Sequence, residues 1–269
     1  MRFVLFLLGP LALCGGQATK PLQPREAPVY TAASIVNSAD YQSGALAPNA
    51  IGTVFGQNLA YTTLALSSDE IQGGYLPTAL GLSDVQLLIG GLLANLYYVS
   101  PTQVNFLVPS ILLPGPVNVQ LVVDSLAGPP IPLQLAAAAP GLFQLDAVNA
   151  VATRPDGSVV TPDDPAKPGD VVVLYATGLG QVVPPIGYGE VPTAAAPLAL
   201  MGDLQVLLNG TAVDPANVLY AGLTPGFAGL YQINLQLPAT TGANPEVRVA
   251  LGSAISIPGV KLPVNSVTP

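Results

Sequence analysis

The sequence contains no histidine and no tryptophan, and its only cysteine is Cys14. Without histidine, the chain lacks the commonest general base, the serine–histidine–aspartate triad and the commonest transition-metal ligand. Because Cys14 lies in the hydrophobic N-terminal stretch, no other residue could supply a thiol nucleophile or a thiolate zinc site. A disulfide framework is excluded as well, so stability must come from burial of apolar side chains.

Charged residues are also scarce, at 8% of the chain, and acidic residues outnumber basic ones by 15 to 7. No basic stripe is present that could attract nucleic-acid phosphates or an anionic membrane surface. Half of the 269 residues are apolar, which is enough for a sizeable core. The 28 glycines and 29 prolines indicate many turns and few long helices.

The N-terminus reads MRFVLFLLGPLALCGGQATK. One arginine, a short apolar run and then small residues predict a signal peptide over residues 1–18, cleaved after Ala18. Lipid attachment at Cys14 is the alternative, which Leu13 disfavours because a small residue is expected there. No later stretch has the apolar length of a membrane span. We therefore expect a secreted protein, or one held at the outer cell surface or in the periplasm, with residues 19–29 as a linker.

Three sequence blocks occur twice, in the same order and roughly 120 to 130 residues apart, close to the usual size of a domain. SDVQLLIGG (83–91) matches GDLQVLLNG (202–210), and PTQVNFLVP (101–109) matches LYQINLQLP (230–238). APNAIGTVFGQNLA (47–60) resembles KPGDVVVLYATGLG (167–180). The repetition predicts two copies of one domain, at residues 30–137 and 138–269.

Each copy consists of brief Val-rich segments, such as residues 117–123 and 171–176, separated by turn signals. Gly90-Gly91 and Asn209-Gly210 stand at matching positions, where two-residue hairpin turns require positive φ. No amphipathic helix is evident. The pattern predicts an all-β fold of two tandem immunoglobulin-like antiparallel β-sandwiches.

Four stretches carry a resemblance to a known family: VNSADYQSGALAPNAIGTVFGQNLA, YYVSPTQVNFLVP, PAKPGDVVVLYATGLG and YAGLTPGFAGLYQINLQLP. They resemble the Solibacter-type C-terminal domain of acidobacterial exported proteins, whose halves are similar to IPT/TIG-type immunoglobulin-like (E-set) domains. The resemblance covers about residues 30–264. It implies a bacterial, extracytoplasmic, non-catalytic module, and the family offers no catalytic residues to carry over.

The densest acidic stretch, RPDGSVVTPDDPAKPGD, contains Asp156, Asp163, Asp164 and Asp170. Carboxylates can hydrolyse glycosides without histidine, and loop oxygens can hold Ca²⁺. Here, however, they stand beside Pro and Gly, where Asp has an ordinary turn role, and their spacing matches no calcium-loop signature. We expect solvated turn residues, no cofactor and no catalytic residues, with these four as the ligands if Ca²⁺ binds.

Two kinds of segment are candidates for a binding surface. The first is the repeated amide strand, with Gln103 and Asn105 in one copy and Gln232 and Asn234 in the other. Tyr97, Tyr98, Tyr220 and Tyr231 lie around it, and a Tyr can stack on a sugar ring while its hydroxyl stays wet. The alternative is that one of Tyr97 and Tyr98 points into the core and the other outward, and that the amides belong to a shared structural strand.

The second kind is a pair of long segments at corresponding places, residues 61–77 and 181–199, which exceed the length of hairpin turns. Their candidate side chains are Tyr61, Tyr75, Tyr188 and Glu190. The alternative is that each loop folds over a sheet edge and protects it from aggregation.

Together these features predict an exported, non-catalytic structural or interaction module whose partner is an unknown protein or polysaccharide at the cell surface. The alternative function is a carbohydrate-binding module for cell-wall or environmental polysaccharide. An enzyme is disfavoured because the usual catalytic side chains are missing.

Overall fold

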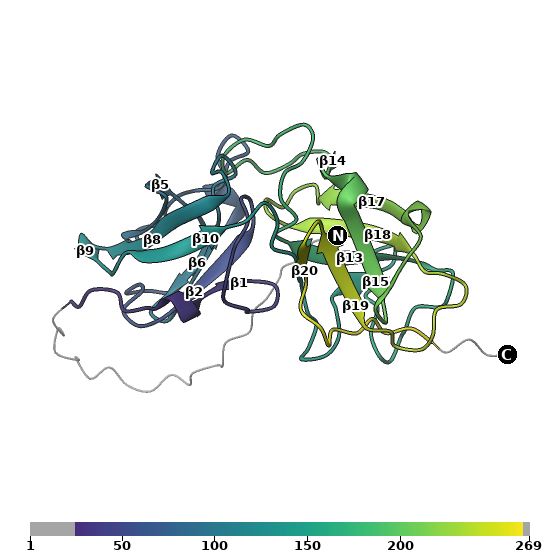
Figure 1. Cartoon of the computed structure of the whole chain (residues 1–269). Helices are drawn as coiled ribbons and strands as arrows, with labels where there is room; N and C mark the ends of the chain where they lie inside the picture. Colours follow the sequence, from purple (N-terminus) through teal and green to yellow (C-terminus); the bar gives the residue numbers. More distant parts are fainter. Residues whose placement is uncertain (1–24, 266–269) are drawn as a thin grey trace.

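The computed structural model describes residues 25–265, so the predicted signal peptide, Cys14 and the first part of the linker lie outside the described residues. The described chain folds into two antiparallel β-sandwiches that follow one another in the sequence (Figure 1). Both are immunoglobulin-like, as predicted.

The first sandwich packs a sheet of order β1-β2-β7-β6-β3 against a sheet of order β10-β8-β4-β5, with β9 paired to β8. Its strands are β1 (Ile35–Asn37), β2 (Ile51–Phe55), β3 (Leu64–Ala65), β4 (Val85–Ile89), β5 (Leu92–Leu93), β6 (Asn95–Ser100), β7 (Gln103–Leu107), β8 (Gly115–Val123), β9 (Leu126–Ala127) and β10 (Ile131–Leu135).

The second sandwich repeats this plan with a sheet of order β11-β13-β18-β17-β14, where β12 also pairs with β13, and a sheet of order β16-β15-β19-β20. Its strands are β11 (Gly141–Leu142), β12 (Ala152–Thr153), β13 (Val171–Thr177), β14 (Ala196–Pro197), β15 (Leu204–Leu208), β16 (Thr211–Ala212), β17 (Val218–Leu223), β18 (Tyr231–Gln236), β19 (Val247–Leu251) and β20 (Ala254–Ile255).

The sequence repeat corresponds to a structural repeat. The amide strand is β7 in one copy and β18 in the other, and each lies between its equivalents of β2 and β6. A break in strand register also recurs in both copies. The register shifts between Leu96 and Tyr98 on β6 and between Val218 and Tyr220 on β17. The hairpin turns at Gly90-Gly91 and Asn209-Gly210 have positive φ at both residues, as predicted.

Each sandwich has its own core. One cluster of buried side chains runs from Tyr30 to Leu135 in the sequence, and another from Ala138 to Val264. Alternation along β7 and β18 explains the pattern: Val104 and Phe106 face the first core, and Ile233 and Leu235 face the second. The exact domain boundary at 137/138 stays a prediction.

The helical content of the described residues is limited to short 3₁₀ turns, consistent with the glycine and proline content. They are η1 (Ala32–Ser34), η2 (Ser68–Glu70), η3 (Met201–Asp203) and η4 (Pro215–Asn217). Within residues 25–265, no helix is long and apolar enough to cross a membrane.

Candidate functional site

The predicted amide positions lie on the outer face of the sheet in both copies. Gln103 and Asn105 project away from the first core and are half-buried. The Gln103 Nε2 group donates to Asn105 Oδ1 at 2.8 Å, and in the second copy Gln232 Nε2 donates to Asn234 Oδ1 at 3.1 Å. The same side-chain hydrogen bond, two residues apart on one strand, therefore exists in each sandwich.

Aromatic side chains flank this amide pair on the neighbouring strands. In the first copy Gln103 lies opposite Phe55 of β2, and Asn105 lies opposite Tyr98 of β6. Tyr41 extends this row, since its ring centroid lies 5.9 Å from that of Phe55.

In the second copy the arrangement is the same. Gln232 lies opposite Tyr175 of β13, and Asn234 lies opposite Tyr220 of β17. The hydroxyl of Tyr220 donates to the carbonyl of Leu223 at 3.0 Å, which holds its ring along the strand. We call Phe55, Tyr98, Gln103 and Asn105 the first amide row, and Tyr175, Tyr220, Gln232 and Asn234 the second.

The other two tyrosines near the amide strands have buried hydroxyls. The Tyr97 hydroxyl donates to the carbonyl of Ala228 in the second sandwich at 2.7 Å, and its burial raises the Tyr97 pKa. Tyr231 belongs to the second core, where it donates to the carbonyl of Gly180 and accepts from Asn49 of the first sandwich. Tyr97 is the extra residue of the β6 bulge, and its side chain packs between the two sandwiches and not in the core of the first.

The two long loops predicted as separate binding candidates pair with each other. The amide of Leu76 donates to Gly189 and the amide of Val191 donates to Gly74, each at 2.8 Å, which forms an antiparallel bridge between Tyr75 and Glu190. Backbone hydrogen bonds between segments 115 residues apart join one sandwich to the other. The loops therefore link the two copies.

The four candidate side chains in these loops have different surroundings. Tyr75 is exposed beside the bridge, whereas the Glu190 carboxylate accepts from the Gly187 amide at 2.8 Å. Burial raises the pKa of Tyr188, whose hydroxyl has no partner among the described residues. Tyr61 lies elsewhere, with the Arg25 guanidinium 4.8 Å from its ring centroid. The structure does not gather these four into one site.

A third apolar cluster lies in the contact between the sandwiches, which we call the seam. It buries Leu76 and Leu107 of the first sandwich against Ala228 of the second, and partly buried side chains surround them: Ile51, Leu66, Ile71, Tyr97 and Val191. Leu107 continues the outward side of β7 after Gln103 and Asn105, yet it is fully buried. The second sandwich covers that end of the sheet.

Polar contacts reinforce the seam. The Thr177 hydroxyl accepts from the Ile51 amide at 2.9 Å and donates to the carbonyl of Gly229 at 2.7 Å. Asn37 donates to the carbonyl of Ala139 in the connecting segment at 3.1 Å. These buried hydrogen bonds fix the relative positions of the two sandwiches. If the sandwiches separated, the polar groups would lose their partners at a cost in free energy.

Glycines allow the closest approaches at the seam. A Cβ on Gly229 would stand 2.5 Å from Leu107 Cδ1 and 2.9 Å from Ile51 Cγ1, and one on Gly189 would stand 2.5 Å from Asn95 Nδ2. Both glycines also have positive φ. Gly178 allows a similar close approach between two backbone segments. A Cβ on Gly178 would lie 2.1 Å from the carbonyl oxygen of Ala139.

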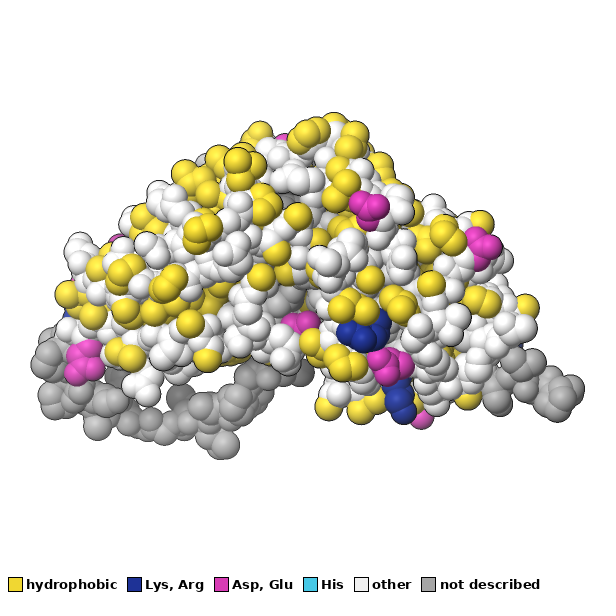
Figure 2. All heavy atoms as spheres, viewed as in Figure 1, with side chains coloured by type: hydrophobic (Ala, Val, Ile, Leu, Met, Phe, Trp, Pro, Cys, Tyr) yellow, Lys and Arg dark blue, Asp and Glu magenta, His cyan; other side chains and the backbone are white. Residues whose placement is uncertain are grey.

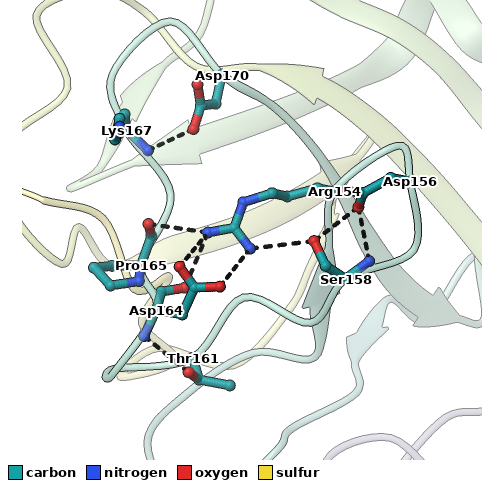
Figure 3. Close-up of polar contacts among 8 residues, drawn as sticks. All are labelled: Arg154, Asp156, Ser158, Thr161, Asp164, Pro165, Lys167 and Asp170. Carbon is teal, nitrogen blue, oxygen red and sulfur yellow. Dashed lines mark hydrogen bonds and ion pairs between the residues drawn. The ribbon is translucent and has the colours of Figure 1, made fainter.

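The acidic stretch surrounds an arginine (Figure 3). The Arg154 guanidinium donates to both carboxylate oxygens of Asp164, to the carbonyls of Asp164 and Pro165, and to Ser158 Oγ. Asp156 accepts from the amide and hydroxyl of Ser158, and Asp170 accepts from the Lys167 amide. The contacts of Asp156 and Asp170 are ordinary turn roles of Asp, whereas Asp164 forms an ion pair with Arg154. Hydrogen bonds from Ser158 lower the pKa of Asp156.

We predict that Arg154→Ala will lower the free energy of unfolding by about 1–3 kcal/mol, because the two carbonyls and Asp164 lose charge-assisted hydrogen bonds. Urea denaturation measures the change. Asp163→Ala is the matched control from the same loop and should be nearly neutral. Equal losses in both variants would contradict the role given to Arg154.

Calcium binding by Asp156, Asp163, Asp164 and Asp170 stays untested. Within residues 25–265, no group of three or more acidic, histidine or cysteine side chains is placed to hold a metal ion. Because three of the four carboxylates already accept protein hydrogen bonds, we predict that millimolar Ca²⁺ leaves the melting temperature unchanged relative to EDTA. A concentration-dependent rise in melting temperature would contradict this.

No family model and no curated protein matches the chain significantly. Several solved structures have a similar chain path. A surface glycan-binding protein of the Bacteroides ovatus mixed-linkage glucan utilization locus, in complex with a heptasaccharide, is 10% identical, with 82% of this chain and 43% of that one covered at a TM-score of 0.32. The Prevotella bryantii protein PbSGBP-B is 11% identical, with 87% and 41% covered at a TM-score of 0.27.

Domains 5–6 of the S-layer protein SbsC are 11% identical, with 90% of this chain and 100% of that chain covered at a TM-score of 0.27. The chain spans less than half of the two glycan-binding proteins. Likenesses this distant say nothing of what this chain binds.

Proposed function

We propose that this protein is an exported, non-catalytic module of the bacterial cell surface or secretome, in which two immunoglobulin-like sandwiches act as one rigid structural or interaction unit. The observation that supports this most is the seam. Paired loops, an apolar cluster and buried hydrogen bonds all join the two copies, whereas sandwiches connected only by a linker would move independently.

The side-chain chemistry supports a non-catalytic role. The sequence has no histidine, and three of the four acidic side chains of the densest cluster are engaged by turn amides, a hydroxyl or Arg154. The resemblance to the Solibacter-type family and the signal-peptide pattern support export. Cleavage after Ala18 would remove Cys14, so retention at the surface would not use a lipid on this cysteine.

Fractionation of the producing bacterium tests this function directly. We expect an antibody to detect the protein in the medium or on intact cells, with an N-terminus that begins at Thr19. We also expect the purified protein to be retained by isolated cell envelopes. A cytoplasmic pool with an intact N-terminus would contradict export, and loss of retention by envelopes would contradict an interaction role.

A further inference from the structure

In each sandwich, the sheet that contains β7 or β18 carries an amide row. The Gln and Asn side chains of this row have four hydrogen-bonding groups, of which two have partners within the protein. Gln103 Nε2 and Asn105 Oδ1 bond to each other, and Thr53 Oγ1 also donates to Asn105 Oδ1 at 3.0 Å. Gln103 Oε1 and Asn105 Nδ2 form no hydrogen bond within the described residues. The internal bond therefore holds one acceptor and one donor in place on the half-exposed face.

The second row leaves the same two groups open. Gln232 Nε2 bonds to Asn234 Oδ1, and neither Gln232 Oε1 nor Asn234 Nδ2 has a partner among the described residues. A fixed acceptor and donor in neighbouring positions match a pair of adjacent hydroxyls, because each hydroxyl both donates and accepts. The repetition of this arrangement in both copies goes beyond what the packing of each core requires, since these side chains face away from it.

Aromatic rings stand on both sides of each amide pair, Phe55 and Tyr98 in the first row and Tyr175 and Tyr220 in the second. An aromatic ring can pack against an apolar ring face while neighbouring groups make hydrogen bonds. Rings and amides together suit a ligand with apolar faces and hydroxyl edges. A pyranose has this shape.

The absence of charge on the two sheets that carry the amide rows favours a neutral ligand. No Asp, Glu, Lys or Arg occurs in the strands of either sheet, although the chain as a whole carries a net charge of −8. On the face shown in Figure 2, hydrophobic and uncharged polar side chains predominate, and Lys or Arg side chains lie next to Asp or Glu side chains near the lower middle of the view. A polyanion would meet no cation on these strands and would be repelled by the net charge.

We propose that the two amide rows bind a neutral polysaccharide chain. The inference rests on the proposed function as an interaction module and names the ligand class. Two equivalent rows on one rigid body suit a repeating polymer, because binding at one row raises the effective concentration of the same chain at the other.

Affinity gel electrophoresis of the full chain tests this with three neutral polymers, hydroxyethylcellulose, galactomannan and soluble starch, and with the polyanion alginate. We expect at least one neutral polymer to retard the protein and alginate not to. Tyr98→Ala and Tyr220→Ala should each weaken binding roughly tenfold, and the double variant roughly a hundredfold or more. Phe227→Ala, which removes an exposed aromatic ring in the turn between β17 and β18, is the matched control and should bind like the parent.

Circular dichroism and the melting temperature establish that each variant is folded. If no neutral polymer retards the parent, if alginate alone does, or if the folded double variant binds like the parent, the proposal is overturned. Retention by cell envelopes without polysaccharide binding would leave the interaction module intact and assign its partner to protein. The two proposals can therefore fail separately.

Discussion

Gly229→Ala is expected to lower the free energy of unfolding by about 2–5 kcal/mol and to loosen the seam. The new methyl group would overlap Leu107 and Ile51, which belong to the first sandwich, and overpacking costs about 1–3 kcal/mol. Positive φ at a residue with a Cβ adds a further cost of about 1–2 kcal/mol. Urea denaturation measures the loss of stability, and hydrogen exchange at the Leu76 and Val191 amides reports whether the paired loops separate.

Gly226→Ala is the matched control for this prediction. Gly226 lies in the same turn with a φ of 86°, but a Cβ there would meet nothing within 4 Å. It therefore carries the backbone cost without the overlap at the seam. If both variants lose the same stability and exchange at the same rates, the contact of Gly229 with the first sandwich has no energetic importance.

Stability is expected to fall steeply above pH 10. Burial raises the pKa of both Tyr97 and Tyr231 far above the ordinary value of 10.0. In the unfolded chain these phenols lose their protons near pH 10, whereas in the folded protein they keep them. The stabilisation is therefore complete below pH 10 and is lost as the pH rises, by about 1.4 kcal/mol per pH unit for each group, or about 2.7 for both.

Urea midpoints measured between pH 9 and pH 12 test this dependence. Tyr97→Phe should reduce the slope by about 1.4 kcal/mol per pH unit, because the Tyr97 phenol would no longer contribute. The same variant should cost about 1 kcal/mol at pH 7 through loss of the hydrogen bond to Ala228. A folding stability that is flat to pH 12 would show that folding protects neither hydroxyl, and a slope unchanged in Tyr97→Phe would show that it does not protect the Tyr97 hydroxyl.

Much of the fold could be predicted from sequence because its determinants are local. Alternation along residues 103–107, the Asn209-Gly210 turn and the repeated blocks each report on a strand or turn without reference to distant contacts. The side of β7 that carries Gln103 and Asn105 was also predictable. The hydrogen bond between them was not, since it depends on rotamers that the pattern does not specify.

The seam could not be predicted, because the contacts between two copies leave no periodic signal. Leu107 follows the outward alternation of Gln103 and Asn105, and only the neighbouring sandwich explains its burial. The loops at 61–77 and 181–199 were predicted as binding candidates from their length and equivalent places, and nothing in the sequence indicated that they pair. The sequence around Gly189 and Gly229 does not indicate their close approach to the other copy, which appears only in three dimensions.

The distance between spin labels on the two sandwiches tests the rigid two-domain unit most directly. Cys14 is the only cysteine, so Cys14→Ser gives a background in which Leu82→Cys and Leu219→Cys are the only labelled sites. Leu82 is 96% exposed in the first sandwich and Leu219 is 55% exposed in the second. Pulsed electron–electron double resonance should give one narrow distance distribution, which broadens in Gly229→Ala. A broad distribution in the parent chain would show that the sandwiches move independently.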